Sequence, residues 1–184
     1  MATQLTDYYK DLIQEVVSSA DAEGIYHAES FFNFCGSILA ESGEIETADY
    51  SPYIDSRGFT LVDGYGGDPN ESDGILSLIV GDFSPSETIG SLTNTEITRL
   101  FRRLQNFVQQ SLKSSFREAL SPLNPGFGLA DTISTCWGSL EGVKLIIITN
   151  RLLSSIESNR PVEEVEGVRC TFSIWDVRRL GNIL

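Results

Sequence analysis

The chain is poor in the side chains that most often carry chemistry or covalent cross-links. Its 184 residues include one histidine, three cysteines and one methionine. The lone His27 and the scattered Cys35, Cys136 and Cys170 have no spacing typical of a zinc site, and an odd number of cysteines does not complete a disulfide framework. We therefore expect no zinc centre, no histidine base and a reducing compartment, the cytoplasm.

Long hydrophobic runs are also missing. The longest fully apolar run extends only from Leu145 to Ile148, far short of the roughly 20 residues that a membrane helix needs. The opening residues, MATQLTDYYKDLIQEV, lack the basic and apolar regions of a secretory signal. We expect no membrane association and one domain over residues 1–184, because a chain of this length can bury a single large core.

Positive charge is scarce as well. Thirteen Lys and Arg stand against 26 Asp and Glu, which gives a net charge of −13 and a sequence pI near 4.4. Phosphate neutralisation supplies most of nucleic-acid affinity, so this balance argues against autonomous nucleic-acid binding by the domain and leaves room only for a local patch. Such a patch could form where five cations fall within residues 99–117. We assign phosphate or partner contact to four of them, Arg99, Arg102, Arg103 and Arg117; the alternative is the exposed face of an amphipathic helix.

Periodic apolar residues predict the helices. The spacing i, i+3, i+4, i+7 indicates helices over about residues 4–19 and 25–43, which we expect to pair as a hairpin. Thr93 to Glu96, TNTE, forms a capping box, with Leu92 and Ile97 as its hydrophobic staple. An apolar stripe continues from there to Leu120, before Pro122, and predicts one long helix. A short helix is expected over residues 129–139.

Strand patterns lie between these helices. Two apolar runs, 59–62 and 75–80, flank a Gly-, Pro- and acid-rich loop and predict a hairpin, while 143–149 is typical of a central strand and 168–175 of a further one. We interpret 51–56 as a connection, 84–92 as a loop and 151–156 as a short helix or turn. The order predicts an α/β fold: an N-terminal helical hairpin and a mixed central sheet with a long helix packed on it.

One group of acids suggests chemistry. Asp63 and Asp82 lie near the ends of the two hairpin strands, and Glu41 or Glu44 ends the preceding helix. Converging carboxylates are the ligands that Mg²⁺ prefers for phosphodiester chemistry. The alternatives are structural: Asp63 with Gly64 is a common turn pair, Asp82 could end its strand, and the run of glutamates at 41, 44 and 46 is typical of a solvated helix end.

Six segments together resemble the N-terminal domain of the abortive-infection phage-resistance (AIPR) proteins of bacteria and archaea. They are FFNFCGSILAESGEI (31–45), FTLVDGYGGD (59–68), ILSLIVGDF (75–83), SLTNTEITRLFRRLQNFVQQSL (91–112), VKLIIITNRLLS (143–154) and FSIWDVRRL (172–180). The resemblance implies a role in antiviral defence. It also implies that these residues form the N-terminal module of a longer protein, with the C-terminal region as a partner.

The element order also resembles the αβββαβ core of the restriction-endonuclease-like fold. In that fold a helix glutamate, a strand aspartate and an E/Q-x-K motif on the next strand hold the metal and activate water. The resemblance places Glu44 at the helix acid and Asp63 at the strand aspartate. The third motif departs, because Val80 stands in place of its carboxylate and Asp82 in place of its lysine.

Three functions are compatible with these observations. The first is a degenerate nuclease-like domain that serves as a scaffold or binds a protein partner. The second is a Mg²⁺-dependent nuclease that uses Glu44, Asp63 and Asp82 as both catalytic and metal-binding residues. The third is a small-molecule or protein-binding domain. Whether the three carboxylates converge in space is the observation that separates the second from the others.

Overall fold

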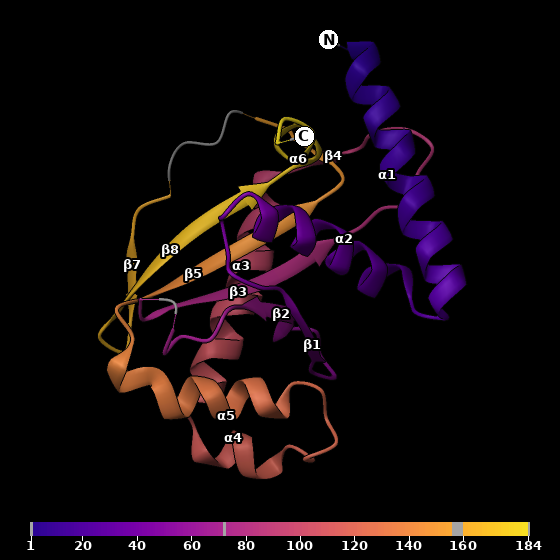
Figure 1. Cartoon of the computed structure of the whole chain (residues 1–184). Helices are drawn as coiled ribbons and strands as arrows, with labels where there is room; N and C mark the ends of the chain where they lie inside the picture. The colour runs from indigo at the N-terminus through magenta and orange to yellow at the C-terminus, as the bar shows by residue number, and fades with distance from the viewer. Residues whose placement is uncertain (1, 72, 156–159, 184) are drawn as a thin grey trace.

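A six-stranded mixed sheet forms the centre of the molecule, and helices cover both of its faces (Figure 1). The computed structural model describes residues 2–71, 73–155 and 160–183. The strands of this sheet are β1 (Asp49–Ile54), β2 (Leu61–Gly66), β3 (Ile75–Asp82), β5 (Gly142–Thr149), β7 (Glu163–Val165) and β8 (Val168–Trp175). The helices are α1 (Ala2–Glu23), α2 (His27–Glu41), α3 (Asn94–Ser111), α4 (Ser114–Ala119), α5 (Phe127–Cys136), the 3₁₀ turn η1 (Trp137–Ser139) and α6 (Val177–Gly181). The predicted α/β class is confirmed.

The strand order across the sheet is β1-β2-β3-β5-β8-β7. The first three strands form an antiparallel meander, which confirms the predicted hairpin between β2 and β3. The chain then crosses over through α3, α4 and α5 to β5, which pairs in parallel with β3 on one side and with β8 on the other. The predicted central strand is therefore confirmed. Two short strands, β4 (Ser91–Leu92) and β6 (Leu152–Leu153), form a separate parallel pair.

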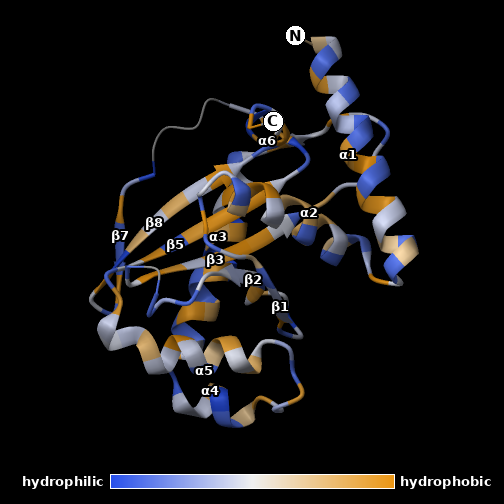
Figure 2. Ribbon diagram, in the orientation of Figure 1, coloured by the Kyte–Doolittle hydropathy of each residue, from blue (hydrophilic) through white to orange (hydrophobic). Residues whose placement is uncertain are grey.

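Two hydrophobic cores lie on opposite faces of this sheet. Alternate residues of β5 illustrate the division: Leu145 and Ile147 pack with α3 and α5, whereas Ile146 and Ile148 pack with α1, α2 and α6. Because both faces are covered, the central strands are hydrophobic along most of their lengths (Figure 2). Among the residues that the structure describes, none of the helices is both long and apolar enough to cross a membrane.

The predicted N-terminal helix pair is confirmed. Leu12 and Val16 of α1 are fully buried against α2, where Phe31 and Phe32 cover the sheet. Ser30 fixes the crossing, because its Oγ donates a hydrogen bond of 2.7 Å to the backbone oxygen of Val16. The three cysteines are free and buried, in agreement with the absence of a disulfide pattern.

The helix α3 begins at the predicted capping box. The hydroxyl of Thr93 accepts from the backbone N–H of Glu96, and the Glu96 carboxylate accepts from the N–H of Thr93 at 2.8 Å. Leu100, Leu104 and Phe107 are buried as expected from the apolar stripe.

The prediction of one long helix as far as Leu120 is wrong. The chain leaves the helical conformation at Lys113, whose φ of −91° and ψ of 124° are extended, and α4 is a separate short helix. The apolar period continues across this break because Phe116 of α4 still packs on Phe107 and Tyr53.

Three further segments differ from the sequence-based expectation. Residues 51–56 are mostly strand β1 rather than a connection, and Pro52 is accommodated because β1 is an edge strand with an irregular register between Tyr50 and Tyr53. The expected loop at 84–92 ends in β4. The expected helix or turn at 151–156 contains β6, and residue 156 lies outside the described residues.

Candidate functional site

Asp63 lies in the middle of β2 and faces the α1–α2 side of the sheet. Its Oδ2 accepts a hydrogen bond of 2.7 Å from the backbone N–H of Gly81 on β3. Burial raises the pKa of this carboxyl to about 6, although the Gly81 N–H and the more distant Arg103 act in the opposite direction. Tyr50 lies close enough for the Asp63 charge to contribute to its own raised pKa of about 12, which is due mainly to burial.

The turn interpretation of Asp63 and Gly64 is wrong, because both residues lie within β2. The glycine is required by packing instead. A Cβ at Gly64 would overlap the backbone oxygen of Asp49 and the ring of Phe32. Gly64 therefore lets α2 approach the sheet directly beside Asp63.

Asp82, at the end of β3, belongs to an ion-pair cluster centred on Arg151. The guanidinium contacts both carboxylate oxygens of Asp82, at 2.8 and 2.9 Å, and Glu96 Oε1 at 3.1 Å. Thr149 adds a hydroxyl hydrogen bond of 2.7 Å to Asp82. This cluster joins the ends of the neighbouring strands β3 and β5 to the start of α3, so Asp82 stabilises the fold at this edge of the sheet.

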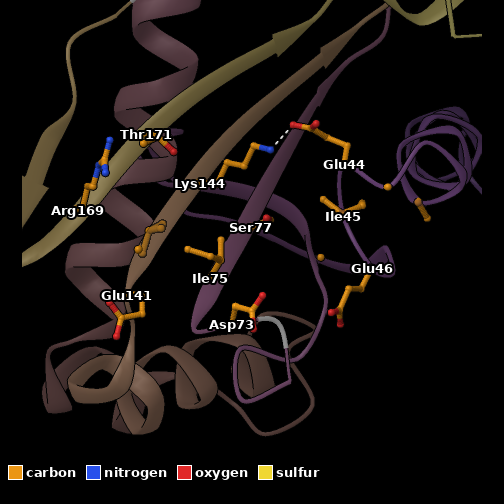
Figure 3. A pocket seen from close by; sticks show the side chains of 15 residues that line it. Glu44, Ile45, Glu46, Asp73, Ile75, Ser77, Glu141, Lys144, Arg169 and Thr171 are labelled. Atoms are coloured by element: carbon orange, nitrogen blue, oxygen red, sulfur yellow. Dashed lines mark hydrogen bonds and ion pairs between the residues drawn. The ribbon is translucent and has the colours of Figure 1, made fainter.

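Glu44 lies just beyond α2 and pairs with Lys144 of β5 (Figure 3). Lys144 is the one Lys, Arg, Asp or Glu residue of β5. It belongs to a polar row across three strands, because Ser77 of β3, Lys144 of β5 and Thr171 of β8 are register partners.

This polar row forms part of the floor of an open cavity of about 960 Å³. Figure 3 shows Glu46, Asp73, Glu141 and Arg169 around the same space. Four acids and two cations line it, so its formal charge is negative. A cavity of this size can admit a small polar molecule, but its charge opposes the entry of a phosphate backbone.

The structure does not bring the three candidate carboxylates together. Asp82 follows Gly81 on β3 and so points to the face opposite Asp63. Glu44 shares a face with Asp63, but its partner Lys144 lies level with Ser77, four residues along β3 from Gly81, or about 13 Å at ~3.3 Å per residue. Over the described ranges, no group of three His, Cys, Asp or Glu side chains is placed to hold a metal ion.

Three of the four candidate arginines do gather. Arg99, Arg102 and Arg103 of α3 line a groove of about 740 Å³ together with Arg57 and Phe59 from the β1–β2 loop. These residues define the arginine groove. Arg117 lies elsewhere, and its Nη1 donates to the backbone oxygen of Ser111 at 2.7 Å, next to the end of α3.

Sequence reasoning missed several residues that organise these sites. Lys144 is a lone cation within the apolar strand GVKLIIIT, which is itself a signal of a polar partner. Arg151 follows β5 as Asp82 ends β3, and the ends of adjacent parallel strands meet, so their pairing was accessible once the strand order was known. Arg57 and Phe59 carried no local signal, because only the fold brings their loop against α3.

Comparison with known proteins gives a family for this chain. The family model described as the abortive infection phage resistance protein N-terminal domain matches residues 31–182. The chain therefore belongs to this family, and the matched region runs from within α2 to beyond the end of α6, whereas α1 lies outside it. No curated protein matches the chain significantly. No solved structure does so either.

Proposed function

We propose that this domain is a non-catalytic interaction domain of an abortive-infection phage-resistance protein, built on a degenerate restriction-endonuclease-like core. The family supplies the biological setting.

The order of elements supports the fold assignment. The helix α2 is followed by the three antiparallel strands β1, β2 and β3. A crossover through α3 then leads to β5, which is the next strand of the same sheet and runs parallel to β3. This is the αβββαβ order that the sequence resemblance leads us to expect. β8 and β7 then extend the sheet at its far side.

The separation of the carboxylates carries the proposal of a non-catalytic role. Next to Asp63, β3 presents the side chain of Ile79 and Gly81, which has none, and neither offers a side-chain ligand for a cation or a charge that stabilises an attacking water. Asp82 is neutralised on the opposite face by Arg151, and Glu44 pairs with Lys144. Mg²⁺ catalysis needs oxygen ligands that converge on one ion and a charge that stabilises the transition state. The residues present here do not fit that ion.

We further propose that the domain acts in the cytoplasm, that it is the N-terminal module of a longer protein, and that its partners are the C-terminal region of that protein or a separate protein. A cleft on α1, lined by Tyr9, Ile13 and Val17 among others, supports protein binding. It lies on the side of the sheet opposite α3.

A cleavage assay tests the non-catalytic role. Single- and double-stranded DNA and RNA are incubated with the native chain, with Asp63→Ala and with Asp131→Ala in Mg²⁺ or Mn²⁺. Asp131 is exposed on α5 and serves as the control. We expect no cleavage by any of the three. Cleavage by the native chain and by Asp131→Ala that is lost in Asp63→Ala would establish the all-carboxylate nuclease and overturn the proposal.

The cavity above Lys144 favours a second candidate, a small-molecule-binding domain. Its volume falls within the roughly 300–1,000 Å³ of ligand pockets. A thermal-shift screen of small polar and zwitterionic metabolites tests it. A compound that stabilises the native chain and Arg178→Gln but not Lys144→Met would support this candidate, and the absence of any such compound would exclude it.

A further inference from the structure

We propose that the arginine groove binds the backbone of a single-stranded nucleic acid, with Phe59 as a platform on which a base stacks. This inference goes beyond the interaction role above and concerns the opposite side of the sheet from the α1 cleft. It rests on charge, on the preorganisation of the groove and on one exposed aromatic ring.

The groove concentrates positive charge in a strongly acidic chain. Four of the thirteen cations line it, and none of its lining residues is acidic. In the part of the chain that the structure describes, the ion pairs found involve Lys144 and Arg151, not these four arginines. Since charges are screened beyond about 8–10 Å at physiological ionic strength, a ligand in the groove is governed by these arginines more than by the net charge of −13. The prediction from bulk charge therefore does not extend to this groove.

The arginines on α3 form a single stripe. Arg99, Arg102 and Arg103 are spaced i, i+3 and i+4, so their side chains emerge from one face of the helix. Like charges at this spacing oppose helix stability, so α3 carries this stripe at a cost to its own stability. The planar guanidinium of arginine donates two parallel hydrogen bonds to a phosphate, which lysine cannot do.

Hydrogen bonds from α3 hold the opposite wall in place. Arg103 Nε donates to the backbone oxygen of Gly58, and Asn106 Nδ2 donates to that of Phe59 at 2.7 Å. Gly58 has a φ of +69°, a conformation that glycine adopts without strain. The β1–β2 loop is thereby fixed with Phe59 at the edge of the groove.

Phe59 distinguishes a nucleic acid from an acidic peptide as the ligand. Phe59 is 63% exposed and is not part of either core. It lies in the same groove as the four arginines. An arginine-lined groove with an exposed aromatic ring is the arrangement by which proteins hold single strands, because each base offers a face for stacking. A duplex hides its bases from Phe59, and a peptide made of acidic residues alone has no ring to stack.

Fluorescence anisotropy of labelled dT12 and U12 with the 184-residue chain, in EDTA and over 50–200 mM NaCl, tests the inference. We expect binding whose log–log salt slope is about −2 to −3, because each phosphate contact contributes ~0.7 for a single strand. Inorganic polyphosphate, a 12-base-pair duplex and a twelve-residue glutamate peptide are the comparison ligands. We expect the first two to bind more weakly than dT12 and the peptide not to bind.

Two variants separate charge from stacking. Arg99→Gln with Arg102→Gln should weaken dT12 binding at least tenfold and reduce the magnitude of the salt slope by about 1.4. Phe59→Ala should weaken dT12 binding by about 5- to 100-fold with an unchanged slope and unchanged polyphosphate binding. Lys10→Gln with Arg178→Gln removes the same charge from exposed positions on α1 and α6 and should bind as the native chain does.

Several outcomes would overturn the inference: no binding of dT12 or U12 at 50 mM NaCl, equal binding of the glutamate peptide, an equal loss in the Lys10/Arg178 control, or a Phe59→Ala variant that binds dT12 normally. Strand cleavage in the same reagents with Mn²⁺ would refute only the non-catalytic role. Absence of binding without cleavage would refute only the groove.

Discussion

Arg151 contacts both carboxylate oxygens of Asp82, with Nε 2.8 Å from Oδ2 and Nη2 2.9 Å from Oδ1. Both side chains are about one-fifth exposed, and the same guanidinium reaches Glu96 at 3.1 Å. The acid that the sequence offered as a metal ligand is therefore bound to a cation of its own chain. We therefore expect Asp82 to contribute to the free energy of unfolding.

Arg151→Gln should lower the free energy of unfolding by about 2–3 kcal/mol, because it leaves a partly buried Asp82 without its bidentate partner. Arg151→Lys should recover only part of the lost free energy, since lysine cannot reproduce the two parallel hydrogen bonds of the planar guanidinium. Urea unfolding followed by circular dichroism measures both. Arg178→Gln, at an exposed position, is the control, and equal stabilities for Arg151→Gln and Arg178→Gln would contradict the structural role.

Thr93→Ala should cost about 1 kcal/mol, because it removes the hydroxyl that accepts from the Glu96 N–H at the start of α3. Thr95→Ala removes a similar hydroxyl from an exposed position in the first turn of the helix and should cost much less. Thermal and urea unfolding of the two variants should separate them. A smaller effect at Thr93 than at Thr95 would show that the capping box does not stabilise this helix.

Asp63→Asn should stabilise the fold at neutral pH. The folded pKa of Asp63 is about 6, above its ordinary value of 3.8, so its contribution to stability is complete below pH 3.8 and is lost as the pH rises through 6. The loss is about 1–3 kcal/mol, at 1.36 kcal/mol for each pKa unit. Asparagine avoids it and can still accept from the Gly81 N–H.

The measurement is the urea-unfolding free energy of the native chain and Asp63→Asn between pH 4 and pH 8. The advantage of the variant should grow from pH 4 to pH 7 and then level off. Asp131→Asn, at an exposed position on α5, controls for the loss of an acidic charge. A constant difference between Asp63→Asn and the native chain at every pH would contradict the assigned pKa.

Gly64→Ala should destabilise the fold by about 3 kcal/mol or more, because the new methyl group would overlap backbone and the Phe32 ring, neither of which can easily move. Gly128→Ala is the matched control. It lies in α5 with no atom within 4 Å of the added Cβ, and there alanine should stabilise by about 0.5–1 kcal/mol. Opposite signs for the two variants are the expected result, and equal effects would be inconsistent with this packing.

The sequence predicted those parts of the fold that depend on local patterns. Amphipathic spacing located α1 and α2, the capping box located the start of α3, and an uninterrupted apolar run located β5 as a central strand. The break after Ser111 was not predictable in this way, because the side chains of α3 and α4 share one apolar period across it. β1 was missed because proline is accommodated only in edge strands, and the sequence alone does not show that the strand containing Pro52 lies at an edge.

The candidate sites were less accessible, because each depends on which residues the fold brings together. Asp63 of β2 bonds to Gly81 of β3, and alternation along β3 turns the next residue, Asp82, to the opposite face of the sheet. Arg99, Arg102 and Arg103 were found because they lie on one helix. Their neighbours Arg57 and Phe59 required knowledge of how the β1–β2 loop packs on α3.

The parallel seam between β3 and β5 has a consequence for folding. The β1–β3 meander can form from neighbouring residues, whereas β3 and β5 pair only after the whole crossover from β4 to η1 has been closed. Pairings between distant segments are slow because the entropy of closure is lost before contacts repay it. Ile147→Val on β5 should therefore show a higher φ-value in stopped-flow refolding than Val62→Ala on β2 if closure of the seam is rate-limiting. Until β5 pairs with β3, the free edge of β3 stays open to pairing with other chains. Aggregation during refolding should therefore depend on how fast β5 docks on the β1–β3 meander more than on the stability of either part alone.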